Sequence, residues 1–284
     1  MNSIQASLLK NPQSVAADMA NNIRRLIATN KKVVFVEGVI DEKIYSKFLN
    51  LDNVFVYKLY GYPNILIGVK EINRLKATYK DRYFAIKDAD FDRILGKGYE
   101  PENILLTDYH DIEMFLLCEE EVYSVFEKEF NIQFASGIEN AIEEIKVLSF
   151  LKLYNCIKEL GYSFKKKCTV RKLYKKGDIS LYNCLLALQS DKRNCDCKSL
   201  EEGEIFSFIE EFKEVAKEQL TNGHDLMQIV VIKLNELNYK INDDCTLLSD
   251  KLIDNYTLDK FKKTKLYLKI VEIEKKTQCK ILLS

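Results

Sequence analysis

Residues that interrupt regular structure are scarce in this chain, which has only 3 prolines and 10 glycines among 284 residues. Turns are enriched in these two residues, so their scarcity argues against a sandwich of many short strands and favours long helices. Net charge is absent as well, because 43 basic residues balance 43 acidic ones. The field of the whole molecule therefore does not attract nucleic acid, and any such binding must come from a local basic patch.

Long apolar runs and a recognisable targeting segment are also lacking. No stretch approaches the roughly 20 apolar residues that a membrane-spanning helix needs. The segment Met1–Asn11 does not combine a basic start with an apolar run, as a signal peptide would. We therefore expect a soluble cytoplasmic protein without membrane association, whose 8 scattered cysteines are reduced thiols.

Only two cysteines are closely spaced, Cys195 and Cys197, and their nearest partners in the sequence are Cys184 and Cys168. Zinc sites use such residues, but the usual two pairs of cysteines, each with a gap of two residues, are not there. Reduced thiols without a metal are the favoured interpretation.

The first part of the chain alternates strand-like and helix-like segments, which predicts a mainly parallel α/β sheet covered by helices. We expect strands at Lys32–Glu37, Asn53–Leu59, Tyr83–Asp88 and Asn103–Leu106, and helices at Ser14–Thr29, Asp41–Leu49, Pro63–Leu75 and, as one or two pieces, Asp111–Phe130. The hydrophobic content of 47% is ample for a core, and the length allows two domains. A change in periodicity near residue 136 predicts an α/β domain at 1–135, with a leading helix, and a mainly helical domain at 136–284.

Acidic residues gather where two of the predicted strands end. Asp88, Asp90 and Asp92 follow the third strand at alternate positions, and Glu37 with Gly38 follows the first. At an effective dielectric constant of about 20, two like charges roughly 4 Å apart repel by about 4 kcal/mol, so converging carboxylates must separate, take up protons or share a divalent cation. If strands one and three are neighbours, Glu37 faces the aspartate loop at the carboxyl edge, where open α/β sheets bind ligands. The other interpretation is that these acids only terminate strands and cap helices.

The segments Val36–Asp41 and Asp88–Asp92 resemble the two signature motifs of the toprim domain, which occurs in topoisomerases, primases and old-family nucleases. With Thr107–Leu116 added, the sequence is similar to a bacterial toprim-like family that is often encoded beside ABC-type ATPases in anti-phage loci and that includes the effector nuclease of the PARIS defence system. Asn222–Leu226 also looks like a late motif of that family. The resemblance implies a toprim α/β domain, Rossmann-like in architecture.

This resemblance implies a nuclease that cleaves phosphodiester bonds with Mg²⁺ or Mn²⁺. In it, Asp88 and Asp90 would hold the metal, and Glu37 would be a further ligand or the general acid/base. Asp92 would support a second ion or bind through water, and Glu113 is the next candidate ligand. The resemblance further implies a toxic effector of anti-phage defence that acts on RNA, including transfer RNA, or on DNA. An ABC-type ATPase partner would control it, and a homo-oligomer remains open.

Several other polar residues have both a chemical and a structural interpretation. Asp111 would either ligate an ion or cap a helix, and His110 before it is a candidate catalytic group. For Asp41 a helix N-cap is favoured over a metal ligand. His224 and Asp225 would form either a proton-transfer couple or the start of a capped helix, Leu226–Leu237, with Asp225 near its positive end, and the second interpretation is favoured.

Basic charge is concentrated in one short segment that also contains Phe164 and Tyr174. Its members are Lys165, Lys166, Lys167, Arg171, Lys172, Lys175 and Lys176. This is the predicted seat of a nucleic-acid backbone, although a solvated helix face is the ordinary alternative. A weaker second candidate consists of Lys262, Lys263 and Lys265.

Two other classes of protein compete with a nuclease. The first is a regulatory or scaffold subunit that keeps the toprim fold and binds an ATPase without catalysis, although such a subunit would be expected to lose some of the carboxylates. The second is a glycosyltransferase, in which Asp88 and Asp90 would hold the diphosphate of a nucleotide sugar through manganese. Glu37 and Gly38 have no role in that enzyme.

Overall fold

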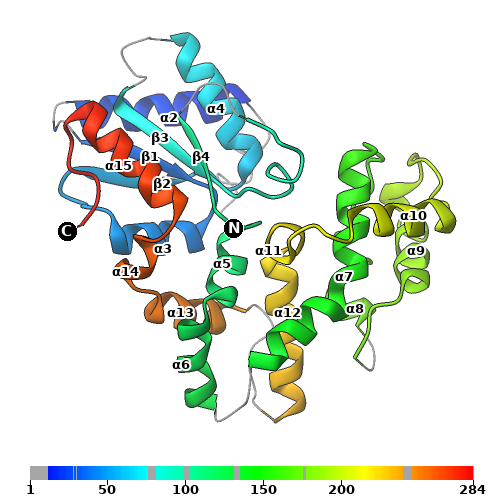
Figure 1. Ribbon diagram of the computed structural model, residues 1–284. Helices are drawn as coiled ribbons and strands as arrows, with labels where there is room; N and C mark the ends of the chain where they lie inside the picture. The colour runs from blue at the N-terminus through cyan, green and yellow to red at the C-terminus, as the bar shows by residue number, and fades with distance from the viewer. Residues whose placement is uncertain are drawn as a thin grey trace. The chain divides into compact units, whose positions relative to one another are not determined.

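The computed structural model describes residues 12–27, 29, 31–75, 81–98, 103–130, 135–174, 177–238 and 245–283. The chain divides into two compact units. The sheet unit consists of Met1–Asp88, Gly98–Asp108 and Tyr256–Ser284, and the helical unit consists of Ala89–Lys97 and Tyr109–Asn255. Figure 1 labels the helices and strands of both units.

A four-stranded parallel sheet forms the centre of the sheet unit. The strands are β1 (Lys32–Val36), β2 (Val54–Lys58), β3 (Tyr83–Lys87) and β4 (Ile104–Leu106), in the order β2-β1-β3-β4. Every residue of β1 and β3 is buried, as expected for central strands that are covered on both faces. The predicted strands and their parallel pairing are confirmed, and strands one and three are neighbours, which was the condition for Glu37 to lie near Asp88.

Helices from both ends of the chain cover the sheet. They are α2 (Pro12–Ile27), α3 (Val39–Phe48), α4 (Tyr62–Leu75), α14 (Leu258–Phe261) and α15 (Lys265–Thr277). On one face α2 and α4 lie together, and α3 lies on the opposite face (Figure 1). Met19 of α2 packs in one cluster with Ile65 and Val69 of α4 and with the β1 residues Val33 and Phe35. Alternate residues of the strands thus point to the two helical layers.

The last part of the chain returns to the sheet unit. Phe261 stacks on Phe48 of α3 with ring centroids 5.1 Å apart, and Leu49 forms an antiparallel bridge with Leu282. The amide of Leu283 also donates to the Phe48 carbonyl at 2.9 Å. The C-terminal segment is therefore part of the α/β layer in space.

The helical unit contains the remaining elements. They are α5 (Ile112–Cys118), α6 (Glu120–Phe130), α7 (Ala135–Ile157), α8 (Val170–Leu173), α9 (Leu181–Gln189), the short 3₁₀ helix η2 (Lys192–Asn194), α10 (Glu202–Phe212), α11 (Lys217–Leu220), α12 (Gly223–Glu236) and α13 (Thr246–Asn255). In the described part of the chain, no helix is both long and apolar enough to cross a membrane. All eight cysteines are free thiols.

The division between the units differs from the boundary predicted near residue 135. Helices α5 and α6 belong to the helical unit, where α5 packs on α12 and α6 on α13, and residues 256–284 belong to the sheet unit. Hydrophobic periodicity shows which face of a helix is buried, but it does not show which element covers that face. The boundary also falls inside the aspartate loop, because Asp88 closes one segment and Ala89 opens the next.

Candidate functional site

Glu37 and Asp88 lie at the carboxyl edge of the sheet. Glu37 follows β1 directly and Asp88 follows β3 directly, and these strands are hydrogen-bonded neighbours. The backbone amide of Asp88 donates to Glu37 Oε1 at 3.0 Å. Both side chains are half-buried. The structure therefore brings together two of the residues that the sequence selected, at the edge where parallel sheets bind ligands.

The turn after β1 is fixed by a backbone and a carboxylate contact. Gly38 is the N-cap of α3, and its amide donates to Asp41 Oδ2 at 2.9 Å. The amide of Gly61 donates to the carbonyl of Glu37 at 3.0 Å. Asp41 is buried, and burial raises its pKa to about 6 although two backbone hydrogen bonds oppose the rise. The prediction that Asp41 is the N-cap is wrong in position. The N-cap is Gly38, and Asp41 lies three residues after it and accepts a hydrogen bond from its amide.

A buried cation lies next to Asp88. Lys87 is the last residue of β3 and is 1% exposed, and its ammonium group donates to the carbonyl of Asp88 at 2.6 Å. The same group lies 5.0 Å from the ring centroid of Tyr62, within the range of a cation–π interaction. Lys87 was not among the residues predicted from the sequence. Its signal was a lysine at the end of an otherwise apolar central strand.

Tyr45 of α3 is fully buried close to the same carboxylates. Burial raises the pKa of its hydroxyl well above the usual value, and the charges of Asp41 and Asp88 add to the rise. Among the described residues its hydroxyl oxygen has no hydrogen-bond partner. A phenol in this environment stays protonated and keeps its O–H as a hydrogen-bond donor.

A third carboxylate follows the sheet at β4. Both oxygens of Asp108 accept hydrogen bonds, from the amides of Lys265 at 3.2 Å and Leu266 at 3.1 Å, at the start of α15. A carboxylate is stabilised there by the positive end of the helix dipole. Asp108 was not among the candidates, and the structure gives it the role of joining β4 to α15.

The second and third aspartates of the loop belong to the helical unit. Asp90 has a left-handed backbone with φ of 45°, and its amide donates to the carbonyl of His110 at 2.7 Å. Asp92 is buried, and its Oδ1 lies 3.7 Å from the ammonium group of Lys97. Aspartate tolerates the left-handed region better than most residues, so the conformation at Asp90 fits its residue type.

His110 is held by α11 and by an aromatic side chain of the aspartate loop. Its amide donates to the carbonyl of Glu218 at 2.8 Å, and its Nδ1 lies 3.0 Å from the carbonyl of Gln219, which makes that nitrogen the donor. Phe91 contacts the imidazole edge to face with centroids 4.9 Å apart. Burial lowers the pKa of His110, so the ring is neutral near neutral pH.

Asp111 caps α5 and at the same time binds the start of α12. Its Oδ1 accepts from the amide of Met114 and its Oδ2 from the amide of Gly223, each at 2.7 Å. Burial raises its pKa to about 7 although both backbone bonds oppose the rise. A Cβ atom on Gly223 would lie 2.2 Å from the Met114 amide nitrogen, so only glycine fits there. Of the two interpretations of Asp111, the structure shows the helix cap, and Glu113 lies in the first turn of the same helix.

The His224–Asp225 segment starts α12. Asn222 is the N-cap and accepts from the amide of Asp225 at 3.1 Å. Asp225 is buried and forms an ion pair with Lys152 of α7, whereas His224 is exposed. The favoured interpretation of a capped helix is confirmed, with Asp225 near the positive end of the helix.

The predicted basic segment lies in the helical unit. Lys165, Lys166, Lys167, Arg171 and Lys172 are exposed. Lys175 and Lys176 lie outside the described residues. The second basic group, Lys262, Lys263 and Lys265, is exposed in the sheet unit, where Lys262 lies 3.4 Å from Asp259 Oδ1.

The carboxylate oxygens of Glu37 and Asp88 at the sheet edge are suitable ligands for a divalent cation. Carboxylates are hard oxygen ligands, and Mg²⁺ is often held by only one or two of them together with water and substrate phosphates. Glu37 and Asp88 supply two. Among the described residues, no group of three or more histidine, cysteine, aspartate or glutamate side chains is arranged to hold a metal, and this includes the cysteines considered for zinc.

Comparison of the chain with models of protein families and with curated proteins finds no match.

Proposed function

We propose that this protein is a toprim-type nuclease that cleaves phosphodiester bonds with Mg²⁺ or Mn²⁺, with Glu37 and Asp88 in its metal centre. The hydrogen bond from the Asp88 amide to Glu37 Oε1 carries the proposal, because it joins the ends of two neighbouring parallel strands through the acidic residues selected from the sequence. The parallel sheet and the positions of both residues after their strands support it further.

The residues have distinct roles in this proposal. Asp88 binds the metal, and Glu37 is either a second ligand or the base that takes a proton from the attacking water. An ion held there would supply an activated water and would neutralise charge on the phosphate. The Asp88 amide orients the Glu37 carboxylate, and the Lys87 ammonium offsets the negative charge of this edge.

Asp90 and Asp92 remain proposed ligands on the basis of the sequence motif. Asp92 already lies near the Lys97 ammonium group, so we assign it the supporting role rather than a direct bond. Glu113 remains a candidate ligand of lower rank. The role as toxic effector of anti-phage defence, the control by an ABC-type ATPase and the choice between RNA and DNA rest on the sequence resemblance.

Cleavage assays on the full chain test the proposal. Labelled DNA and total RNA are incubated with Mg²⁺, Mn²⁺ or a chelator, using wild type, Glu37→Gln and Asp88→Asn. Glutamine keeps an oxygen that accepts from the Asp88 amide, so Glu37→Gln removes the charge and leaves the turn intact. We expect metal-dependent cleavage that each substitution lowers by about 100-fold or more, the scale of losing a catalytic acid or base.

Asp52→Asn is the matched control, because Asp52 is an exposed carboxylate of the same unit, and its cleavage rate should equal that of wild type. Cleavage that survives the chelator, or that survives both substitutions, contradicts a metal nuclease. No cleavage by wild type with any substrate, metal or purified ATPase partner favours the scaffold interpretation. Hydrolysis of a nucleotide sugar instead favours the glycosyltransferase.

A further inference from the structure

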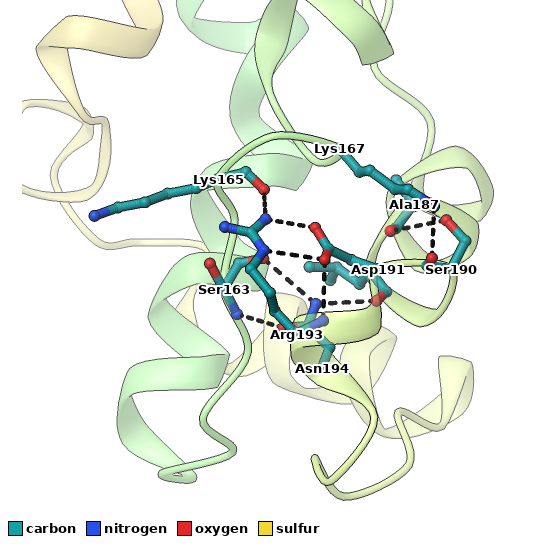
Figure 2. Close-up of polar contacts among 9 residues, drawn as sticks. Ser163, Lys165, Lys167, Ala187, Ser190, Asp191, Arg193 and Asn194 are labelled. Carbon is teal, nitrogen blue, oxygen red and sulfur yellow. Dashed lines mark hydrogen bonds and ion pairs between the residues drawn. The ribbon is translucent and has the colours of Figure 1, made fainter.

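The loop between α7 and α8 is held by hydrogen bonds to its backbone (Figure 2). We call residues 163–167 the basic loop. The amide of Ser163 donates to Asn194 Oδ1 at 2.8 Å, and Asn194 Nδ2 donates to the carbonyl of Leu188 at 2.9 Å. The guanidinium group of Arg193 donates to the carbonyl of Lys165. These bonds fix the loop through its main-chain atoms, which leaves the side chains of Lys165 and Lys166 available.

Arg193 is itself fixed by a buried acid. Its Nε donates to Asp191 Oδ1 at 3.0 Å, and its backbone amide donates to the same oxygen at 3.1 Å. The hydrogen bond from the Arg193 side chain is the main cause that lowers the pKa of Asp191. The charge of Arg193 is thus neutralised by Asp191, and the arginine acts as a brace for the loop rather than as a contact for a ligand.

The lysines of this region have no such neutralising partner. Lys165, Lys166, Lys172 and Lys192 are exposed, and none of the four forms an ion pair with any residue that the structure describes. The Lys165 side chain extends away from the bonded network in Figure 2. Lys166 has φ of 68°, a left-handed conformation that costs a lysine about 1–2 kcal/mol and persists only where the surroundings hold it. A fixed backbone therefore displays several unpaired cations.

A shallow hollow lies beside the basic loop. Lys167 and Lys172 line it with Leu173, Asn183, Ala187 and Ser190, and its volume is about 260 Å³. The ammonium group of Lys167 donates to the Ser190 carbonyl at 2.5 Å, so it is already positioned at the rim. No carboxylate is among these lining residues, and the nearby Asp191 carboxylate, which interacts with the charge of Lys167, is bound by Arg193.

We propose that the basic loop, with Lys172 and Lys192, is a preformed binding surface for the phosphodiester backbone of a nucleic acid. That this nucleic acid is also the substrate rests on the proposed nuclease, but the binding itself does not. The chain has no net charge, so the local excess of exposed lysines is what attracts the negatively charged phosphates. Protein partners are anchored mainly by tryptophan, tyrosine and arginine side chains. The exposed members of the basic loop are lysines, and Phe164 is half-buried.

The main test measures binding of short labelled RNA and DNA to the full chain by fluorescence anisotropy in the presence of chelator. The variant carries Lys165→Gln, Lys166→Gln and Lys172→Gln, and its control carries Lys158→Gln, Lys213→Gln and Lys217→Gln in the same unit. We expect the variant to bind about 10-fold or more weakly and its slope of log affinity against log salt to fall by about 2, because each lost phosphate contact removes roughly 0.7–0.9. The control should match wild type.

A second comparison tests the brace. Arg193→Lys keeps the charge but cannot bridge Asp191 and the Lys165 carbonyl, and Arg193→Gln removes the charge. If Arg193 positions the loop, both variants weaken binding alike, retain the wild-type salt slope and exchange the amides of the basic loop faster. Rescue by lysine, or a slope lowered by about one in Arg193→Gln alone, would make it a direct contact and overturn the brace.

Two outcomes would contradict the proposed nucleic-acid-binding surface. The first is equal affinity of wild type and the triple lysine variant for RNA and DNA. The second is binding of an acidic polypeptide as tightly as RNA and DNA, which would assign the surface to a protein partner. The proposed nuclease is judged separately. Loss of cleavage in Glu37→Gln with intact binding supports the proposed nuclease, whatever the result for the lysine variants. Intact cleavage in Glu37→Gln contradicts the proposed nuclease and leaves the proposal for the basic loop unchanged.

Discussion

The carboxyl edge of the sheet and the junction of α5 with α12 both gather acidic side chains, but they hold them differently. At the sheet edge Glu37 and Asp88 are half-buried, and a backbone amide orients one carboxylate oxygen. At the helix junction Asp111 is buried, and both of its oxygens accept backbone hydrogen bonds. Both regions stand where a predicted strand gives way to a loop or helix, so sequence position alone does not separate them.

The difference lies in what the carboxylate oxygens do. An acid whose oxygens satisfy buried amides stabilises the fold, because losing it leaves those donors without partners. An acid that keeps contact with solvent retains the capacity to bind a cation or to exchange a proton. Asp41 shows that both kinds occur at the sheet edge itself, since it is buried and binds the Gly38 amide.

The largest effect is expected for Gly223→Ala at the helix junction. The added Cβ would lie 2.2 Å from the Met114 nitrogen and 2.3 Å from Asp111 Oδ1, so the two helix starts must separate. We expect the free energy of unfolding to fall by about 3 kcal/mol or more, as for severe overpacking with loss of hydrogen bonds. Urea denaturation measures it. Gly203→Ala in α10 is the matched control, where a Cβ meets no atom within 4 Å, and it should be neutral or slightly stabilising. Equal losses of stability in the two variants would show that the close contacts at Gly223 do not hold the two helix starts together.

Asp111→Ala should follow in magnitude. It removes the cap of α5 and leaves the amides of Met114 and Gly223 without their acceptor. We expect a loss of about 2–4 kcal/mol, the sum of a cap and a buried unsatisfied donor. Asp111→Asn keeps one acceptor oxygen and should lose about half as much. If alanine and asparagine cost the same, the two hydrogen bonds are not what Asp111 contributes.

Asp41 gives a dependence on pH. Its pKa is about 6 in the folded chain, above the ordinary 3.8, so between these values the folded state holds a proton that the unfolded state has lost. The free energy of unfolding due to this carboxyl therefore falls as the pH rises from about 4 to about 6, by on the order of 2–3 kcal/mol. Denaturation of wild type and Asp41→Asn across this range tests it. Wild type should show the steeper fall, and parallel curves would refute the assignment.

Much of the sheet unit could be predicted from the sequence. Apolar runs such as Tyr83–Lys87, separated by helical periodicity, predict parallel strands. The order of the elements permits the pairing of β1 with β3 but does not require it, and the structure shows that pairing. The return of residues 256–283 could not be predicted, because stacking of Phe261 on Phe48 depends on a partner far along the chain. For the same reason, the sequence did not predict that α5 belongs to the helical unit.

The site could be predicted in part. Glu37 and Asp88 stand out because acids follow apolar strands whose pairing brings them together. The bond from Asp111 to the Gly223 amide joins residues 112 positions apart, and no local pattern marks it. Lys87 was overlooked because a lysine in a strand resembles a solvated residue until its burial is known. The acids that follow the strands could therefore be predicted from the sequence, but the hydrogen-bond partners of buried polar groups could not.

The smallest effect on stability is expected where the effect on activity is largest. Glu37→Gln and Asp88→Asn change half-buried groups and preserve the shape of each side chain, so the free energy of unfolding should change by less than about 1 kcal/mol. Removing one of two neighbouring negative charges should even raise it slightly, since functional sites retain repulsion that the fold alone would not select. The measurement is urea denaturation in chelator, with Asp111→Ala as the destabilised reference. A loss as large as that of Asp111→Ala would place Glu37 and Asp88 among the structural acids, and the contrast between the two regions would disappear.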